Sequence, residues 1–143
     1  LGTVTAMAVL GEVVAIEAAG GGQSAGQPWL FDRAGAMIVE LLHETMVLSN
    51  ADDAALLGGA NLAVAGRELI QFGHAEPLGE RRWRLTQLLR GRFGSEEAMG
   101  DVAAGRGFAL LADPALMQLP GAVQAGGAVL IEGQGMPQRW FCR

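Results

Sequence analysis

The hydrophobic positions of this chain form short runs separated by glycines and polar residues, a pattern typical of many short strands. Residues 4–16 are rich in β-branched side chains and are broken by Gly11, which predicts two short strands. A glycine-rich loop is expected at residues 20–27. Residues 37–43 are apolar with Glu40 as the single charged interruption, which predicts a strand buried on both faces.

A hairpin and a further strand are predicted in the middle of the chain. Residues 61–64 form its first strand, residues 65–66 a tight turn and residues 67–72 its second strand. A second turn is expected at residues 77–79, because proline and glycine flank a single residue there. Residues 83–89 begin with alternating apolar and charged positions and lose that alternation over their last two leucines.

The remaining predicted strands are short and lie in the last third of the chain. They are residues 108–111, 116–119, 128–131 and 139–141. Together with the earlier strands they predict a mainly β fold, either an antiparallel sandwich or a partly open barrel of short strands.

One or two short helical turns are expected between these strands. Residues 49–53 offer capping side chains and acids ahead of the apolar residues 54–57, and the glycines at 58–59 end that helix. Residues 95–99 have the same polar start and are closed by Gly100. Both turns are too short to change the fold class.

The composition indicates a single folded domain over residues 1–143. Half of the residues are hydrophobic and only 17% are charged, which excludes disorder caused by poor burial. The net charge of −5 argues against direct nucleic-acid binding, which depends on neutralising phosphates. No apolar run approaches the roughly 18 residues that a membrane-spanning helix needs, so we expect no membrane span.

Every basic residue is arginine, which fits either fixed hydrogen bonds at an assembly surface or the codon usage of a GC-rich genome. A group of these arginines gathers in one stretch: Arg81, Arg82, Arg84, Arg90 and Arg92. Alternate members could project toward an acidic neighbouring subunit. The other interpretation is a solvated strand face with a structural Arg90.

The search for catalytic or metal-binding patterns gives none. His43 and His74 are isolated from each other and from the single cysteine, so no metal site is expected. Ser24 lies in a glycine-rich loop without the strand that a nucleophile elbow requires. The acid pairs Asp52–Asp53 and Glu96–Glu97 stand where helices begin, and adjacent residues do not face each other as an acid/base dyad must. We expect no catalytic residue, no metal and no cofactor.

Ordered motif pieces in the middle of the chain resemble those of a known family. They are a leucine-rich turn ending Gly-Ala-Asn, a strand Glu-Leu-Ile-Gln-Phe, and a strand that runs into Leu-Leu-Arg-Gly-x-x-Gly-Ser-Glu. Their characteristic residues are Asn61, Glu68, Phe72, Leu88, Leu89, Arg90, Gly91, Gly94, Ser95 and Glu96. In this order they are similar to the phage-tail domain of large tail-hub proteins in gene transfer agents and siphophages, proteins that often also carry a TIM-barrel-like region.

The resemblance covers residues 28–119 and leaves the boundaries at residues 1–27 and 120–143 unassigned. Trp83 stands where the family commonly has tyrosine, and Ser95 where it commonly has threonine. A physical interpretation of these residues agrees with the resemblance. We expect the two leucines to fill the core, Arg90 to bond an acid or carbonyls, the glycines to permit a bend, and Ser95 to cap a short helix.

The same resemblance implies that the chain is a fragment of a larger tail protein and a non-catalytic assembly module of a hub or baseplate. Its expected partners are other tail and hub domains, with a homotrimer in the full-length protein. Its expected locations are the tail tip of the virion and, during assembly, the cytoplasm of the producing bacterium.

Two other classes of function remain open. A carbohydrate- or receptor-binding module at the tail tip, recognising a host-surface glycan or receptor, would use exposed aromatic residues, and Trp29, Trp83 and Trp140 are the candidates. A cell-wall hydrolase would need a nucleophile or a carboxylate pair, and the sequence presents neither in a recognisable arrangement.

Overall fold

The computed structural model describes residues 6–17, 31–112, 116, 129–131 and 140–142, with backbone alone for the last two ranges. The chain divides into two compact units, one of Val4–Leu116 and the other of Leu1–Thr3 with Met117–Arg143. The first unit holds a barrel and the second a two-stranded sheet.

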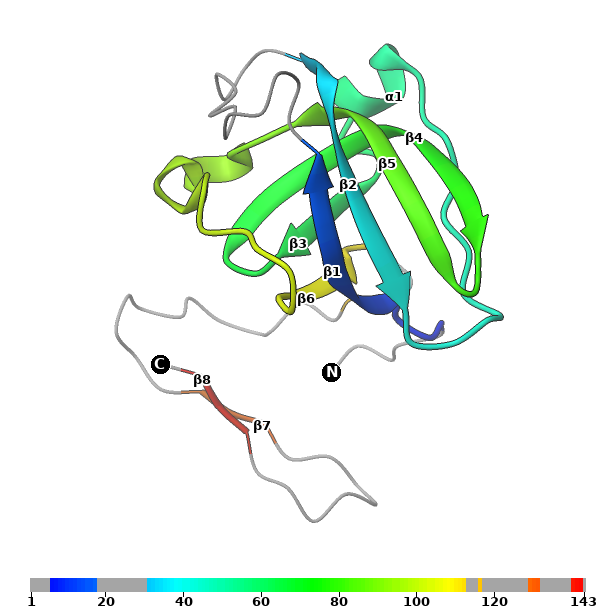
Figure 1. Cartoon of the computed structure of the whole chain (residues 1–143). Helices are drawn as coiled ribbons and strands as arrows, with labels where there is room; N and C mark the ends of the chain where they lie inside the picture. Colours follow the sequence, from blue (N-terminus) through cyan, green and yellow to red (C-terminus); the bar gives the residue numbers. More distant parts are fainter. Residues whose placement is uncertain (1–5, 18–30, 113–115, 117–128, 132–139, 143) are drawn as a thin grey trace. The chain divides into compact units, whose positions relative to one another are not determined.

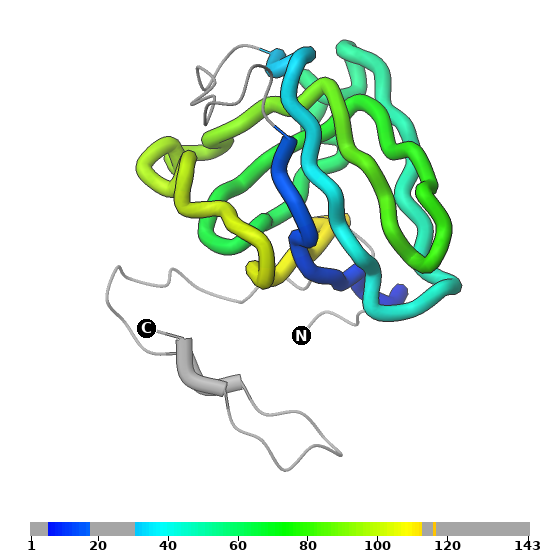
Figure 2. Tube along the Cα trace, in the orientation of Figure 1, coloured from blue at the N-terminus to red at the C-terminus, as the bar shows by residue number. Residues whose placement is uncertain are grey.

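Six antiparallel strands close into the barrel in the order β1-β2-β5-β4-β3-β6, as Figure 1 shows and the tube in Figure 2 follows. Their bounds are β1 Leu10–Glu17, β2 Phe31–Leu41, β3 Leu62–Ala65, β4 Glu68–Gly79, β5 Arg82–Leu89 and β6 Gly107–Leu110. The predicted mainly β fold is confirmed, and the barrel is closed rather than partly open. Closure gives every barrel strand a neighbour on each side for part of its length, while β4 beyond Gln71 is paired with β5 alone.

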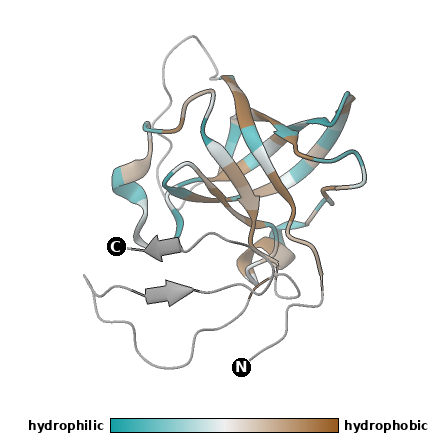
Figure 3. Cartoon of the chain, turned by 90° about the horizontal axis from the view of Figure 1, so that it is seen from below, coloured by the Kyte–Doolittle hydropathy of each residue, from teal (hydrophilic) through white to brown (hydrophobic). Residues whose placement is uncertain are grey.

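The barrel interior is filled by one apolar cluster. Its buried members are Val13, Met37, Val39, Leu41, Leu48, Ala63, Ala65, Ile70, Phe72, Leu85, Leu88, Val102 and Phe108. Figure 3 shows hydrophobic and hydrophilic bands following one another along the strands, as expected when alternate side chains face the interior. β3 contributes only alanines, whose small side chains leave interior volume for Met37 and Phe72.

The first barrel strand differs from its predicted form. Residues 10–17 make one strand, β1, where two short strands were expected, and residues 6–9 are not part of a strand. The break in pattern is instead a bulge between Val13 and Ala15, opposite β2. A bulge of this kind adds one residue to a strand without ending it.

β2 is longer than predicted, and in its second half every other side chain is only partly buried. Residues 32–35 form an irregularity inside the strand opposite β5, where Asp32 Oδ1 accepts from the N–H groups of Ala34 (3.1 Å) and Gly35 (2.7 Å). Beyond it, buried positions alternate with the half-buried Ile38 and Glu40. The prediction that this strand is buried on both faces is therefore wrong.

The predicted hairpin is confirmed as β3 and β4, with its turn one residue later, at Gly66–Arg67. β4 then continues through the expected turn at residues 77–79, and the chain reverses at Glu80–Arg81 instead. Pro77 fits inside this strand because β3 pairs only with the first part of β4. One side of β4 is free at Pro77, so a missing N–H need not break a ladder there.

β5 shows the predicted loss of alternation. Leu85 is buried, and Gln87 adopts a left-handed conformation with a φ of 56°. This conformation changes which side of the strand the following residues face. As a result Leu88 and Leu89 are both buried, as the sequence pattern indicates.

Among the described residues of the first unit, a short helix and two single 3-10 turns accompany the strands. The helix α1 spans Asp53–Leu57, and Oδ1 of its N-cap residue Asp52 accepts from Ala55 N at 2.8 Å, which confirms the predicted cap. The turns η2 and η3 span Arg92–Gly94 and Glu96–Ala98. Within the part of the chain that the structure describes, no helix is long and apolar enough to cross a membrane.

The second unit contains β7, Val129–Ile131, paired antiparallel with β8, Trp140–Cys142. Both strands lie within one residue of their predicted positions. The strand expected at residues 116–119 falls outside the described residues, apart from Leu116, which is not in a strand.

Candidate functional site

The motif residues converge on a buried ion pair beside the start of β4. Glu68 is the first residue of β4 and is fully buried, and Arg90 follows the end of β5 and is 6% exposed. Nε and Nη2 of Arg90 each donate to one carboxylate oxygen of Glu68, both at 2.7 Å. The N–H of Gly91 adds a third bond to Glu68 Oε1 at 2.9 Å. The pair is therefore bidentate and further supported by the backbone.

A second buried polar side chain, Gln71, lies three residues further along β4. Its Nε2 donates to the carbonyls of Leu56 (2.7 Å), in the last turn of α1, and Ala60 (2.8 Å), which follows the helix. Its Oε1 accepts from Nε of Arg92 at 2.8 Å. Gln71 thus connects α1 to the loop that follows β5 through β4.

Ser95 attaches the same loop to β4 from its other end. Its hydroxyl accepts from the N–H of Leu69 at 2.9 Å and donates to the carbonyl of Arg92 at 2.7 Å. The structure shows no bond from this hydroxyl to the start of η3, so the expected capping role of Ser95 is wrong. A tertiary contact uses the hydroxyl instead.

Asn61 performs a comparable function where α1 leads into β3. Its Nδ2 donates to the carbonyls of Ser49 (2.8 Å) and Phe72 (3.0 Å), and its φ is 52°. Asparagine tolerates this left-handed conformation better than most residues. Phe72 itself is fully buried in the barrel.

The glycines of the motif serve the path of the loop. Gly91 has a φ of 57°, and a Cβ there would lie 2.5 Å from Met99 Sδ and 3.1 Å from Glu96 Cα. Gly94 has a φ of 83° with open space around it. The first glycine is needed for both conformation and space, and the second for conformation alone.

The structure therefore brings together Glu68, Arg90, Gly91 and Ser95, and places Leu88 and Leu89 in buried positions beside them. All three donors that reach Glu68 are held within hydrogen-bond distance, so its carboxylate is committed to the fold. Every described buried side-chain nitrogen and oxygen has a hydrogen-bond partner. The arrangement stabilises the junction between β4, β5 and the loop.

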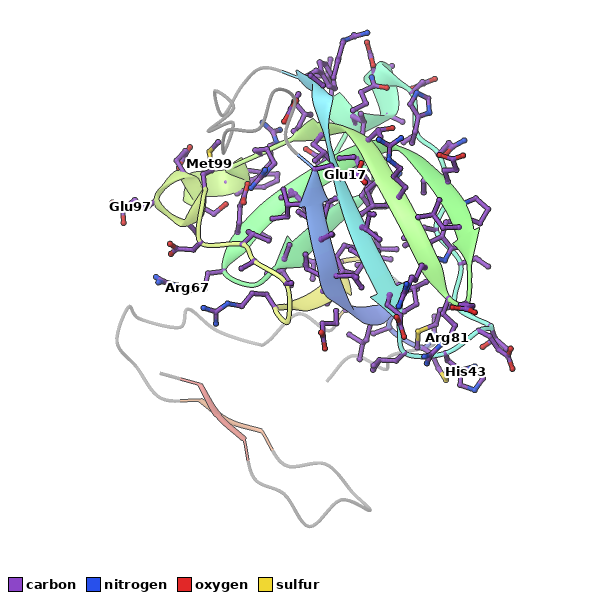
Figure 4. The ribbon with its side chains drawn as sticks, viewed as in Figure 1. Glu17, His43, Arg67, Arg81, Glu97 and Met99 are labelled. Carbon is purple, nitrogen blue, oxygen red and sulfur yellow. The ribbon has the colours of Figure 1, made fainter. Side chains whose placement is uncertain are left out.

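The remaining arginines of the predicted group also have partners within the chain. Arg81 and Arg82 both bind Glu40, at 2.7 Å and 3.0 Å, and Arg84 binds Glu17 at 2.8 Å. Figure 4 shows Arg81 and Glu17 at separate places on the barrel. These pairs are consistent with a solvated strand face, and Arg90 has the structural role described above.

The tryptophans differ in how far the structure describes them. Trp83 is half-buried and packs against the barrel core, so part of its ring is used by the fold. Trp29 lies outside the described residues, and Trp140 is described only by its backbone in β8. The described part of the chain thus supplies one partly available tryptophan for a glycan surface.

The isolated histidines lie on the surface. His43 follows β2, and its Nδ1 lies 2.9 Å from Thr45 Oγ1 and accepts from Thr45 N, as expected for a satisfied side chain at a strand end. His74 is exposed on β4. Among the described residues no group of histidine, cysteine, aspartate and glutamate is arranged to hold a metal ion. Ser24 lies outside the described residues.

Two features were not predicted from the sequence. Gln71 belongs to the quoted motif, but the neighbouring sequence does not predict that its side chain is buried, because a glutamine on a strand is usually exposed. A hollow of about 320 Å³ is lined by Gly66, Arg67, Asp101, Gly105, Arg106 and Gly107. Its glycines come from two segments that are distant in the sequence, so no local sequence pattern predicts the hollow.

Comparison with known proteins gives one family. The family model described as "Rcc01698-like, C-terminal" matches residues 8–109, which include β1 to β5 and most of β6. Neither the curated proteins nor the solved structures give a match to the chain. Because the matched stretch spans well over half of the sequence and almost the whole barrel, the chain belongs to the family of Rcc01698-like C-terminal domains.

Proposed function

We propose that this domain is a non-catalytic structural module of the tail tip of a phage-like particle, in a hub or baseplate protein. The observation that carries the proposal is the use of the motif residues within the fold. Arg90 donates to the carboxylate of Glu68, and the hydroxyl of Ser95 accepts from the N–H of Leu69. Because the polar atoms of these motif residues are hydrogen-bonded within the domain, the motif maintains the fold rather than a catalytic reaction.

The resemblance of the ordered motif to tail-hub proteins supplies the biological setting of this proposal. The partners are other tail or hub domains, and the full-length protein forms a homotrimer. The acidic chain, with a net charge of −5, is suited to protein contacts rather than to direct contact with DNA. In this setting the barrel acts in the virion after assembly in the bacterial cytoplasm.

Fractionation of the producing bacteria tests the assembly role. Antibodies raised against residues 1–143 would follow the full-length protein through a density gradient that separates assembled particles from free proteins. We expect the protein in the particle fraction, together with other tail proteins. Recovery of all of the protein in the free fraction, while complete particles are formed without it, would exclude a role as a structural component.

A further inference from the structure

The hollow described above is lined by two arginines, one aspartate and three glycines. It lies where the turn between β3 and β4 meets the loop that leads into β6. A bond from Gly66 N to Gly107 O, 2.8 Å long, joins these two segments next to the pairing of β3 with β6. Figure 4 shows Arg67, which lines the hollow, well apart from Arg81 and Glu17. The hollow is therefore formed by the closure of the barrel and is separate from the arginine pairs on β5.

The side chain of Arg106 is positioned by Gly66. A Cβ built on Gly66 would lie 3.4 Å from Cβ of Arg106, 3.5 Å from its Cγ and 3.8 Å from its Cδ. The aliphatic stem of Arg106 thus lies across the bare backbone of Gly66, which limits the directions in which the guanidinium can point. A guanidinium that is already restricted loses less conformational freedom when it binds an anion.

Open space remains over the other two glycines. A Cβ built on Gly105 or on Gly107 would meet no atom within 4 Å. The backbone is bare at both positions, so a second chain can approach it closely there.

The charges that line the hollow are unbalanced. Arg67 lies 3.8 Å from Asp101, which is too long for a hydrogen bond, and the two side chains are 84% and 58% exposed. Among the described residues no carboxylate forms an ion pair with Arg106. Glu12, which is paired with Gly107 across β1 and β6, does not line the hollow. Two cations and one anion therefore leave one excess positive charge here, in a chain whose net charge is −5.

This arrangement fits a carboxylate. A guanidinium presents a planar set of N–H donors that matches the oxygens of a carboxylate or a phosphate. The excess charge of the hollow distinguishes these two ligands, because one carboxylate would neutralise it. A phosphate group, which carries nearly two negative charges, would instead leave excess negative charge beside Asp101.

We propose that the hollow binds an acidic side chain of a neighbouring protein domain, with its carboxylate held by Arg67 and Arg106. The occupant is an aspartate or glutamate in an exposed segment whose backbone lies over Gly105 and Gly107. The proposal rests on the assembly role proposed above and states the chemistry of one of its partners. Its test uses the isolated chain and short peptides, so it can fail while the assembly role, which is measured on particles, stands.

An NMR titration of the isotope-labelled chain with the blocked peptide acetyl-Gly-Glu-Gly-amide tests the site. We expect saturable shifts of the amide signals of Gly66, Gly105 and Gly107, with a Kd of about 1–10 mM because the contact is small. The peptide acetyl-Gly-Gln-Gly-amide, which has the same shape without the charge, should bind at least about tenfold more weakly. Raising the NaCl concentration from about 20 mM to about 500 mM should weaken the binding of the glutamate peptide, because the site is exposed.

Three variants separate the hollow from the charge of the whole chain. Arg106→Gln should lower the affinity for the glutamate peptide at least about tenfold. Arg33→Gln is the matched control, because Arg33 lies 3.7 Å from Asp53 in a similarly exposed pair and does not line the hollow. It changes the net charge equally and should alter the affinity less than about twofold. Asp101→Asn should raise the affinity at least about threefold by removing a like charge, and a gain in binding cannot result from unfolding.

Several results would overturn the proposal. One is a titration that does not saturate by about 50 mM of the glutamate peptide, or equal binding of the glutamine peptide. Another is an equal loss of affinity in Arg106→Gln and Arg33→Gln, which would indicate a general effect of charge. Tighter binding of inorganic phosphate than of the glutamate peptide would identify a phosphate site instead. A thermal midpoint lowered by more than about 5 °C in Arg106→Gln would show that a carboxylate of the same chain already fills the hollow, since exposed substitutions otherwise change stability little.

Discussion

Replacing Glu68 by glutamine tests the structural role of the motif. The substitution keeps the size and one acceptor oxygen of the side chain, but it removes the charge that faces Arg90. Arg90 is 6% exposed, so its cation would stay buried without an anionic partner. Breaking a buried pair in this way costs about 3–5 kcal/mol, which is a large part of the roughly 5–15 kcal/mol that stabilises a typical domain.

The expected cost can be measured by urea denaturation and by thermal unfolding. For a unit of the size of Val4–Leu116, each kcal/mol lowers the thermal midpoint by roughly 4 °C, so the expected fall is about 12–20 °C. The matched control is Glu17→Gln, which removes the partner of Arg84 from a pair whose side chains are 42% and 46% exposed. Such an exposed pair contributes at most about 1 kcal/mol.

The double variant Glu68→Leu/Arg90→Met separates the two charges from the space they occupy. Removing both charges should recover most of the loss, because well-packed apolar residues replace buried ion pairs at little cost. The N–H of Gly91 would still lose its acceptor, and we expect about 1–3 kcal/mol to remain lost for that reason. If Glu68→Gln lowers stability no more than Glu17→Gln, the buried pair is not what the motif maintains.

Substitutions at four further residues test neighbouring features by the same unfolding measurements. Gly91→Ala should cost roughly 2–4 kcal/mol, from the positive φ and the contact with Met99, while Gly94→Ala should cost only about 1–2 kcal/mol because its surroundings are open; equal costs would contradict the role given to Met99. Gln71→Met should cost about 1–3 kcal/mol by removing the bonds to the carbonyls of Leu56 and Ala60 and the acceptor of Arg92 Nε, and an unchanged midpoint would show that Gln71 does not secure α1. Asp52→Ala should cost about 1 kcal/mol through loss of the helix cap, whereas Asp52→Ser should retain most of the stability.

The parts of the fold that local patterns determine were predicted correctly. Alternation along β5 ends at two consecutive leucines, and the structure buries both because Gln87 turns the strand there. Asp52 stands before an apolar turn and caps it. In each case a few neighbouring residues contain all of the information.

The parts that depend on distant segments could not be predicted in this way. The barrel closes through β6, which pairs with β1 over Leu10–Glu12 and with β3 over Ala63–Ala65. Neither pairing leaves a mark on the sequence near β6. Pro77 was expected in a turn, but it fits within β4 because β3 does not reach it and one side of β4 is free there. How far β3 extends cannot be recognised from the residues around Pro77.

The candidate site shows the same division. Arg90 was expected to bond an acid or carbonyls, but the sequence did not identify Glu68 as that acid. Ser95 was expected to cap a helix because its sequence neighbours are acidic. Its hydroxyl binds Leu69 N instead, a donor that sequence position alone does not bring near it. The hollow at Asp101 and Gly107 likewise exists only once β6 meets the turn at Gly66.

Immunogold electron microscopy of purified particles, with antibodies against residues 1–143, tests the proposed tail-tip role most directly. The account predicts that gold particles gather at the distal end of the tail, on intact particles and on isolated tails. Labelling confined to the capsid or spread along the tail tube, or intact particles that carry no label while the free protein does, would contradict it.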